Sequence, residues 1–136
     1  MLKTITNHSV HYFDGQKQLL ITESHSVAPT KTSHLLEMEI TQSCLFKYNP
    51  HFWLVDISLL LDHHISVRTI KEVNEWQAVL KRTNLEKIAF VTGYDSTFSF
   101  EYVNLIFEKL KWSPEIPEIK FESFSDKNEA KLWLKG

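Results

Sequence analysis

Short runs of strand-forming residues alternate along this chain with segments whose apolar residues recur every three or four positions. The first two runs, Ser9–Phe13 and Lys17–Glu23, are separated by Asp14-Gly15-Gln16, and an Asp-Gly step between such runs is typical of a hairpin turn. Two later runs, His51–Ile57 and Lys87–Thr92, are almost continuously apolar, which is typical of strands covered on both faces. The pattern therefore predicts an N-terminal hairpin followed by buried strands, and Ile119–Phe124 is expected to form a last strand with one wetter face.

Helical periodicity fills the intervals between these strands. Helices are expected at about 30–46, capped by Thr30 or Thr32, at about 67–83, at about 98–111, and after Asp126. In the first helix, Leu36, Ile40 and Cys44 recur every four residues and are predicted to face the core. In the last, Asp126 and Glu129 have the spacing of a capping box.

The resulting element order is β-β-α-β-α-β-α-β-α. Strands separated by helices of this length need parallel crossovers, which are right-handed by strong preference. We therefore expect an α/β fold in which an N-terminal β-hairpin precedes βαβα units, with a mostly parallel sheet of about five strands packed with helices. Because no repeat, linker or low-complexity segment divides the sequence, residues 1–136 are expected to form a single domain.

Composition narrows the classes of function. The formal net charge is −2, so the chain lacks the basic excess that dominates nucleic-acid affinity, and no nucleic-acid partner is expected. Its three glycines are too far apart for a glycine-rich phosphate loop, and its single cysteine excludes an internal disulfide. The longest apolar runs are far too short to span a membrane, and no secretory signal is evident. These features predict a cytoplasmic protein.

Four stretches of the chain resemble the STAS/SEC14-like domains related to SpoIIAA. They are the opening hairpin, a central hydrophobic strand that runs into Asp56, the strand Lys87–Val91, and a final helix that reads Glu-Ala-Lys-Leu-Trp-Leu from Glu129. The resemblance implies a small cytoplasmic domain that binds a partner or ligand without catalysis. It also implies a regulatory serine after the central strand, where Ser58 or Ser66 could stand, but the glycine of the antagonists' D-S-[ST]-G motif is missing.

Polar residues follow two of the predicted parallel strands, and ligands collect beyond the carboxyl ends of strands in open α/β sheets. The candidate crevice for a ligand or partner is formed by Asp56, Ser58, Asp62, His63, His64, Ser66, Thr92, Tyr94 and Asp95. A metal site would use Asp62, His63 and His64 together with Asp56 or Asp95, but the side chains of adjacent histidines diverge, so solvated side chains are favoured over a metal site. A serine hydrolase would need a nucleophile turn that this sequence lacks, so no catalytic residue, cofactor or metal is predicted. The other histidines, including His11, are expected at the surface or at strand edges.

Aromatic residues crowd the predicted helix at about 98–111. Phe100 and Phe107 are seven residues apart and lie off the stripe expected to face the core. This second apolar face indicates either deeper burial or a protein contact, and a homodimer is the expected form of such a contact.

The sequence thus predicts a non-catalytic STAS/SEC14-like module that acts through protein–protein contact or regulation. The alternative is a carrier or sensor of a small apolar or lipid-like ligand, held between the sheet and the aromatic helix. An enzyme is the third interpretation.

Overall fold

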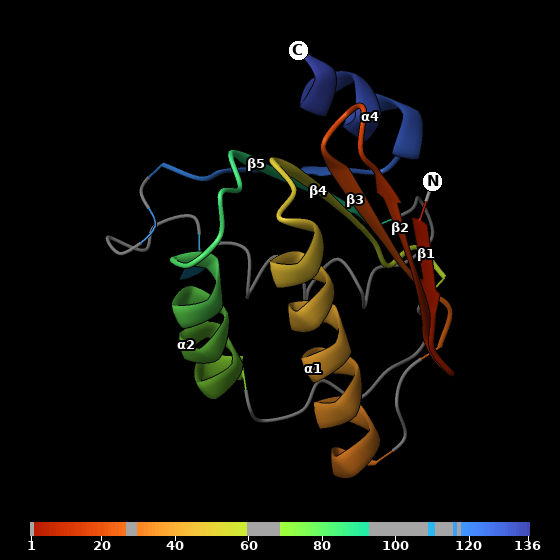
Figure 1. Ribbon diagram of the computed structural model, residues 1–136, viewed down its shortest axis with the longest axis vertical. Helices are drawn as coiled ribbons and strands as arrows, with labels where there is room; N and C mark the ends of the chain where they lie inside the picture. The colour runs from red at the N-terminus through yellow and green to blue at the C-terminus, as the bar shows by residue number, and fades with distance from the viewer. Residues whose placement is uncertain (1, 27–29, 60–68, 93–108, 111–115, 117) are drawn as a thin grey trace.

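A computed structural model describes residues 2–26, 30–59, 69–92, 109, 110, 116 and 118–136 of the chain. These residues form a six-stranded mixed sheet with helices on both faces (Figure 1). The strands are β1 (Leu2–Ile5), β2 (Ser9–Asp14), β3 (Leu19–Ser24), β4 (Phe52–Asp56), β5 (Lys87–Val91) and β6 (Lys120–Phe124). The helices are α1 (Lys31–Tyr48), α2 (Thr69–Leu80) and α4 (Lys127–Lys135).

The strands lie in the sheet in the order in which they occur in the chain. β1, β2 and β3 pair antiparallel, whereas β3, β4, β5 and β6 pair parallel. The predicted α/β class and the mostly parallel sheet after an N-terminal hairpin are confirmed. The predicted number of about five strands was too low, because β1 is a four-residue edge strand with no apolar run of its own.

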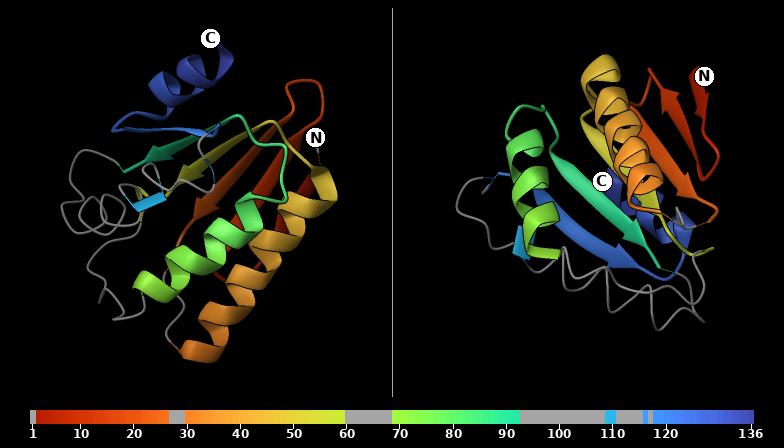
Figure 2. Two further views of the ribbon diagram at one scale, coloured as in Figure 1. Left: turned by 90° about the vertical axis from the view of Figure 1, so that its left-hand side faces the viewer. Right: turned by 90° about the horizontal axis from the view of Figure 1, so that it is seen from below.

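The helices are distributed unequally between the two faces of the sheet. Right-handed crossovers between successive parallel strands place their helices on the same face, and α1 and α2 lie there together (Figure 2). No strand follows α4, so the crossover rule does not constrain it, and it packs on the opposite face over β4, β5 and β6.

Alternation along the strands supplies both faces with apolar side chains. The α1 and α2 face is built around Leu20, Leu45, Trp53, Ile88 and Phe121, all buried. The α4 face is built from Leu19, Ile21, Leu54, Ala89 and Val91, which pack with Ala130 and Leu134 of the helix. The predicted burial of β4 and β5 on both faces is therefore confirmed.

The predicted core stripe of α1 is wrong in one position. Leu36 has 55% of its surface exposed, whereas Met38, Cys44 and Leu45 are buried. Ile40 and Cys44 are confirmed as core-facing, since Cys44 and Leu45 belong to the buried cluster and Ile40 and Tyr48 pack against it. Tyr48 also stacks on Phe13 of β2 with 4.8 Å between ring centroids. The strands beneath the helix thus decide its rotation, which periodicity alone leaves open between neighbouring stripes.

Local turn chemistry differs from the expectation in two places. In the β2–β3 hairpin the left-handed conformation falls on Gln18 (φ 54°) rather than on Gly15, and the Gln18 side chain donates to the Gly15 carbonyl at 2.8 Å. Asp126 is the N-cap of α4 as predicted, but its side chain makes no capping hydrogen bond. A reciprocal capping box instead joins Thr30 and Ser33 at the start of α1.

Among the described residues, no helix combines the length and the apolarity that crossing a membrane would require.

Candidate functional site

The predicted crevice at the carboxyl ends of the strands is represented by three described residues. Asp56 ends β4, and its Oδ1 accepts hydrogen bonds from the Ser58 backbone N–H (3.0 Å) and hydroxyl (2.6 Å). Thr92 follows β5 and is buried, and its N–H donates to the Phe124 carbonyl at 2.9 Å. Asp56 and Thr92 therefore end neighbouring strands, but each makes short-range or inter-strand bonds that hold the sheet edge together.

The remaining candidates lie outside the described residues. These are Asp62, His63, His64, Ser66, Tyr94 and Asp95 of the crevice, and Phe100 and Phe107 of the aromatic helix. Within the described part of the chain, no group of three or more His, Cys, Asp or Glu side chains is arranged to hold a metal ion.

An ion pair that the sequence analysis missed lies at the same edge of the sheet. Lys127, the first residue of α4, pairs with Glu23 of β3, and Glu23 is in register with Asp56. This pair ties the start of α4 to the hairpin. Further along the helix, Lys87 of β5 donates to the Trp133 carbonyl at 3.0 Å and lies over the Trp133 ring, so α4 has a fixed position on the sheet.

Of the described residues, those of α4 cover only part of this face of the sheet, for a simple geometric reason. Six strands spaced about 4.8 Å apart make a sheet roughly 24 Å wide, whereas a helix with its side chains is about 10 Å across. Because α4 packs over β4 to β6, apolar side chains of β3 extend beyond its flank. The fold therefore leaves a groove between α4 and the β2–β3 hairpin.

This groove, called the α4 groove below, has a volume of about 520 Å³. Its floor is apolar and is formed by Leu19, Ile21, Phe52 and Leu134. Leu132 of α4 forms part of its wall with 69% of its surface exposed, whereas Leu19, Ile21 and Leu134 of the floor are buried. The volume lies in the range of small-molecule sites, about 300–1,000 Å³.

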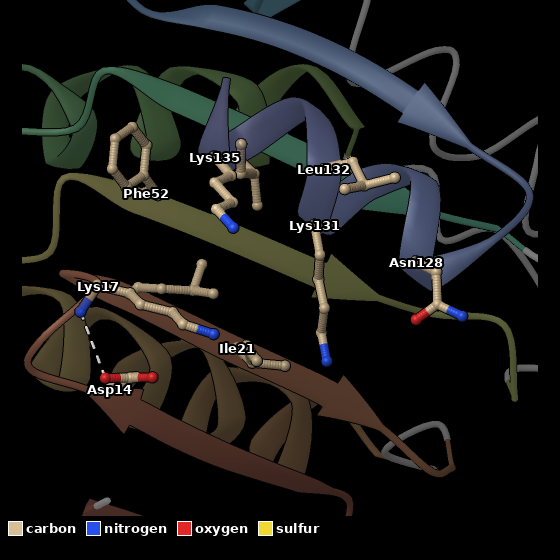
Figure 3. Close-up of a pocket in the computed structure, with 10 residues that line it drawn as sticks. Asp14, Lys17, Ile21, Phe52, Asn128, Lys131, Leu132 and Lys135 are labelled. Atoms are coloured by element: carbon tan, nitrogen blue, oxygen red, sulfur yellow. Dashed lines mark hydrogen bonds between the residues drawn. The ribbon is translucent and has the colours of Figure 1, made fainter.

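Polar side chains surround the α4 groove (Figure 3). Asp14 and Lys17 come from the hairpin, and Asn128, Lys131 and Lys135 come from α4. Figure 3 shows the Lys17 and Lys131 side chains extending from the two elements towards Ile21 of β3, while the Lys135 side chain ends over β4. A sequence signal for this site existed in Lys131-Leu132, where an apolar residue interrupts the polar side of the last helix, but its partner Lys17 lies near the other end of the chain.

A buried polar cluster lies on the opposite face of the sheet. Thr22 accepts a hydrogen bond from the Trp53 indole and is 2.9 Å from Nδ1 of His11, which is fully buried. The expectation that His11 lies at the surface was wrong. Burial lowers the pKa of His11, and the negative charge of Glu37 partly offsets that effect. Nε2 of His11 has no hydrogen-bond partner within the described residues.

The described nucleophile candidates are poorly suited to catalysis. The Cys44 thiol is buried, and burial raises its pKa, so the reactive thiolate is disfavoured. The Ser58 hydroxyl is bonded to Asp56 rather than to a histidine. The α4 groove can therefore hold a ligand, but the described residues provide no activated nucleophile to react with it.

Comparison of the chain with protein-family models, with curated proteins and with solved structures finds no match.

Proposed function

We propose that this protein is a non-catalytic binding module and that its ligand is a small molecule with an apolar body, held in the α4 groove. The observation that carries this proposal is the lining of the α4 groove, in which the mostly buried apolar residues Leu19, Ile21, Phe52 and Leu134 adjoin an exposed Leu132. Removing apolar surface from water stabilises a complex by about 25 cal/mol for each Å² buried. A ligand that covers the apolar atoms still exposed in the groove, those of Leu132 above all, would therefore gain affinity without any rearrangement of the sheet.

The proposal keeps the resemblance to STAS/SEC14-like domains as its family assignment. An antiparallel hairpin followed by parallel strands with intervening helices supports that assignment, as does the C-terminal α4 that begins after Asp126. The proposed ligand site lies on the α4 face, whereas the sequence analysis placed a ligand beside the aromatic helix at about 98–111.

The test uses N-phenyl-1-naphthylamine, a neutral apolar dye whose fluorescence rises when it leaves water. We expect the unmodified protein to bind the dye saturably and Leu132→Asp to weaken binding about tenfold, because a charge would replace one apolar wall of the groove. Leu36→Asp is the matched control, since Leu36 is also an exposed leucine on a helix but lies on the opposite face. Dye binding that is absent, or equal in the two variants, would exclude the α4 groove as a ligand site.

A second candidate function is self-association through β1. This strand is at the end of the described sheet, and its Leu2 and Ile5 side chains are 57% and 67% exposed. Charged residues often protect such edges, but Lys3 lies over the Tyr12 ring, with 5.3 Å from its Nζ to the ring centroid, on a face of the sheet. Two copies of β1 can pair antiparallel about a two-fold axis.

Sedimentation velocity at micromolar concentration tests this second candidate. We expect a dimer for the unmodified protein and a monomer for Ile5→Pro. The Thr6 N–H donates to the Ser9 carbonyl of β2, so the N–H of Ile5, one residue earlier, points away from β2, and proline there removes a donor from the edge. A monomer in the unmodified protein would rule out the β1 dimer.

A further inference from the structure

The charges around the α4 groove are opposite in sign to the net charge of the whole chain. The chain carries −2 overall, yet three of the four charged side chains that line the groove are lysines: Lys17, Lys131 and Lys135. The fourth, Asp14, uses its Oδ1 to accept hydrogen bonds from the backbone N–H groups of Gln16 (3.1 Å) and Lys17 (3.3 Å). Its carboxylate is thus engaged in holding the hairpin turn.

The groove lysines also differ from neighbouring lysines in their contacts. On the same helix, Lys127 is paired with Glu23, and on β5 Lys87 is bonded to the Trp133 carbonyl. Across the described residues, the structure gives none of the three groove lysines a carboxylate partner. Their positive charge is therefore available to a ligand.

Helix geometry concentrates these charges on one side. At about 100° per residue, the α4 residues that line the groove fall within an arc of roughly 160°: Asn128, Lys131, Leu132, Leu134 and Lys135. The acidic Glu129 lies outside that arc, roughly 140° from its centre, so it does not face the groove. Lys17 approaches from the hairpin on the other side (Figure 3).

We infer that the ligand of the α4 groove is a single-chain amphiphile with an anionic head, of the long-chain carboxylate class, bound as a monomer. This inference rests on the proposed function and adds the chemistry of the ligand to it. The carboxylate lies among Lys17, Lys131 and Lys135, and the hydrocarbon chain lies along Leu19, Ile21 and Phe52. Lysine ammonium groups are compact point charges on flexible stems, which suits a small anionic head better than a planar, bidentate partner.

The experiment compares three ligands with the same ten-carbon chain, each kept below its critical micelle concentration: decanoate, 1-decanol and decyltrimethylammonium. Isothermal titration calorimetry is expected to show the tightest binding for decanoate and the weakest for the cation. Dodecanoate is expected to bind about fourfold more tightly for each added CH₂ until the groove is filled. Raising the salt concentration is expected to lower the affinity for decanoate and to leave the affinity for decanol nearly unchanged.

Variants locate the head group. The triple substitution Lys17→Gln, Lys131→Gln and Lys135→Gln is expected to lower the affinity for decanoate about tenfold, a modest factor because exposed charge pairs contribute modestly. The affinity for decanol is expected to stay unchanged. Lys120→Gln is the matched control, since Lys120 is an exposed lysine on β6, at the opposite edge of the sheet from the hairpin. It is expected to bind decanoate as the unmodified protein does.

The outcomes separate this inference from the proposal on which it rests. If the neutral dye and decanol bind and Leu132→Asp weakens both, but decanoate binds no better than decanol, the groove is a ligand site and the anionic class is wrong. If neither dye nor decanol nor decanoate binds, the proposed function itself fails. If the protein instead binds only vesicles that contain anionic lipid and no single amphiphile molecules, that result identifies the ligand as a membrane surface and overturns the inference.

Discussion

The indole N–H of Trp53 donates a hydrogen bond of 2.9 Å to the hydroxyl of Thr22, across two neighbouring parallel strands. An indole can only donate, so Thr22 acts as the acceptor and keeps its own proton for Nδ1 of His11, also 2.9 Å away. One hydroxyl thus bridges buried side chains of β4 and β2, and we expect the stability of this buried cluster to depend on it.

Replacing Thr22 tests that dependence. Thr22→Val preserves the shape of the side chain but leaves the Trp53 indole without a partner, so we expect the free energy of unfolding to fall by about 1–3 kcal/mol. Thr22→Ser retains the hydroxyl, so we expect its free energy of unfolding to fall by less. Urea denaturation followed by tryptophan fluorescence measures both, and equal stability of the valine and serine variants would contradict the expectation.

The buried imidazole of His11 predicts a pH dependence of stability. Burial lowers the pKa of His11 in the folded protein below the ordinary value of about 6.5, although Glu37 partly offsets the shift. Below about pH 6.5 the unfolded chain therefore binds a proton that the folded chain does not, and the free energy of unfolding falls as the pH decreases. Above that pH the contribution of His11 to the free energy of unfolding is constant.

Urea denaturation between pH 7.5 and pH 5 measures this slope. We expect His11→Phe to flatten it, because the variant has no proton to bind at that position. His25→Asn is the control, since His25 is an exposed histidine, and it is expected to keep the slope of the unmodified protein. An unchanged slope in His11→Phe would show that another group is responsible.

Glu37 connects α1 to the turn between β1 and β2. Its carboxylate accepts the Thr6 hydroxyl at 2.7 Å and the His8 backbone N–H at 3.1 Å. Hydrogen bonds to charged groups contribute about 1.5–3 kcal/mol, so Glu37→Ala is expected to destabilise the protein by an amount in that range. It is also expected to speed amide hydrogen exchange at His8.

The matched control is Glu39→Ala, which removes an exposed glutamate from the same helix. Surface substitutions of this kind usually change stability by less than about 0.5 kcal/mol. A similar loss in both variants would mean that helix propensity, rather than the contact with the turn, explains the effect.

The capping residue of α1 can be identified by two alanine substitutions. The sequence left Thr30 and Thr32 as alternatives, and the structure assigns the cap to Thr30, whose hydroxyl accepts the Ser33 N–H at 3.1 Å. Thr30→Ala is expected to lower the unfolding free energy by about 1 kcal/mol, and Thr32→Ala by much less. Thermal melts followed by circular dichroism provide the comparison, and a larger effect at Thr32 would reverse the assignment.

Elements with a strong internal signal were predicted closely. The apolar runs that became β4 and β5 were placed to within about a residue, because a strand buried on both faces must be apolar at nearly every position. β1 was missed, since its backbone pairs with β2 while most of its side chains remain exposed. The burial of His11 was missed for a related reason: its hydrogen-bond partner Thr22 belongs to another strand.

By itself, the sequence determined the α/β class, the hairpin, the order of the later strands and the position of the last helix, because periodicity and turn chemistry are local properties of the chain. Only the tertiary structure decided that α4, of the helices in the described residues, lies alone on its face of the sheet and that Lys17 lies across the groove from Lys131 and Lys135. The physical reason is one of size. A single helix is narrower than a six-stranded sheet, so packing must leave part of that face open, and which residues border the opening depends on contacts between opposite ends of the chain.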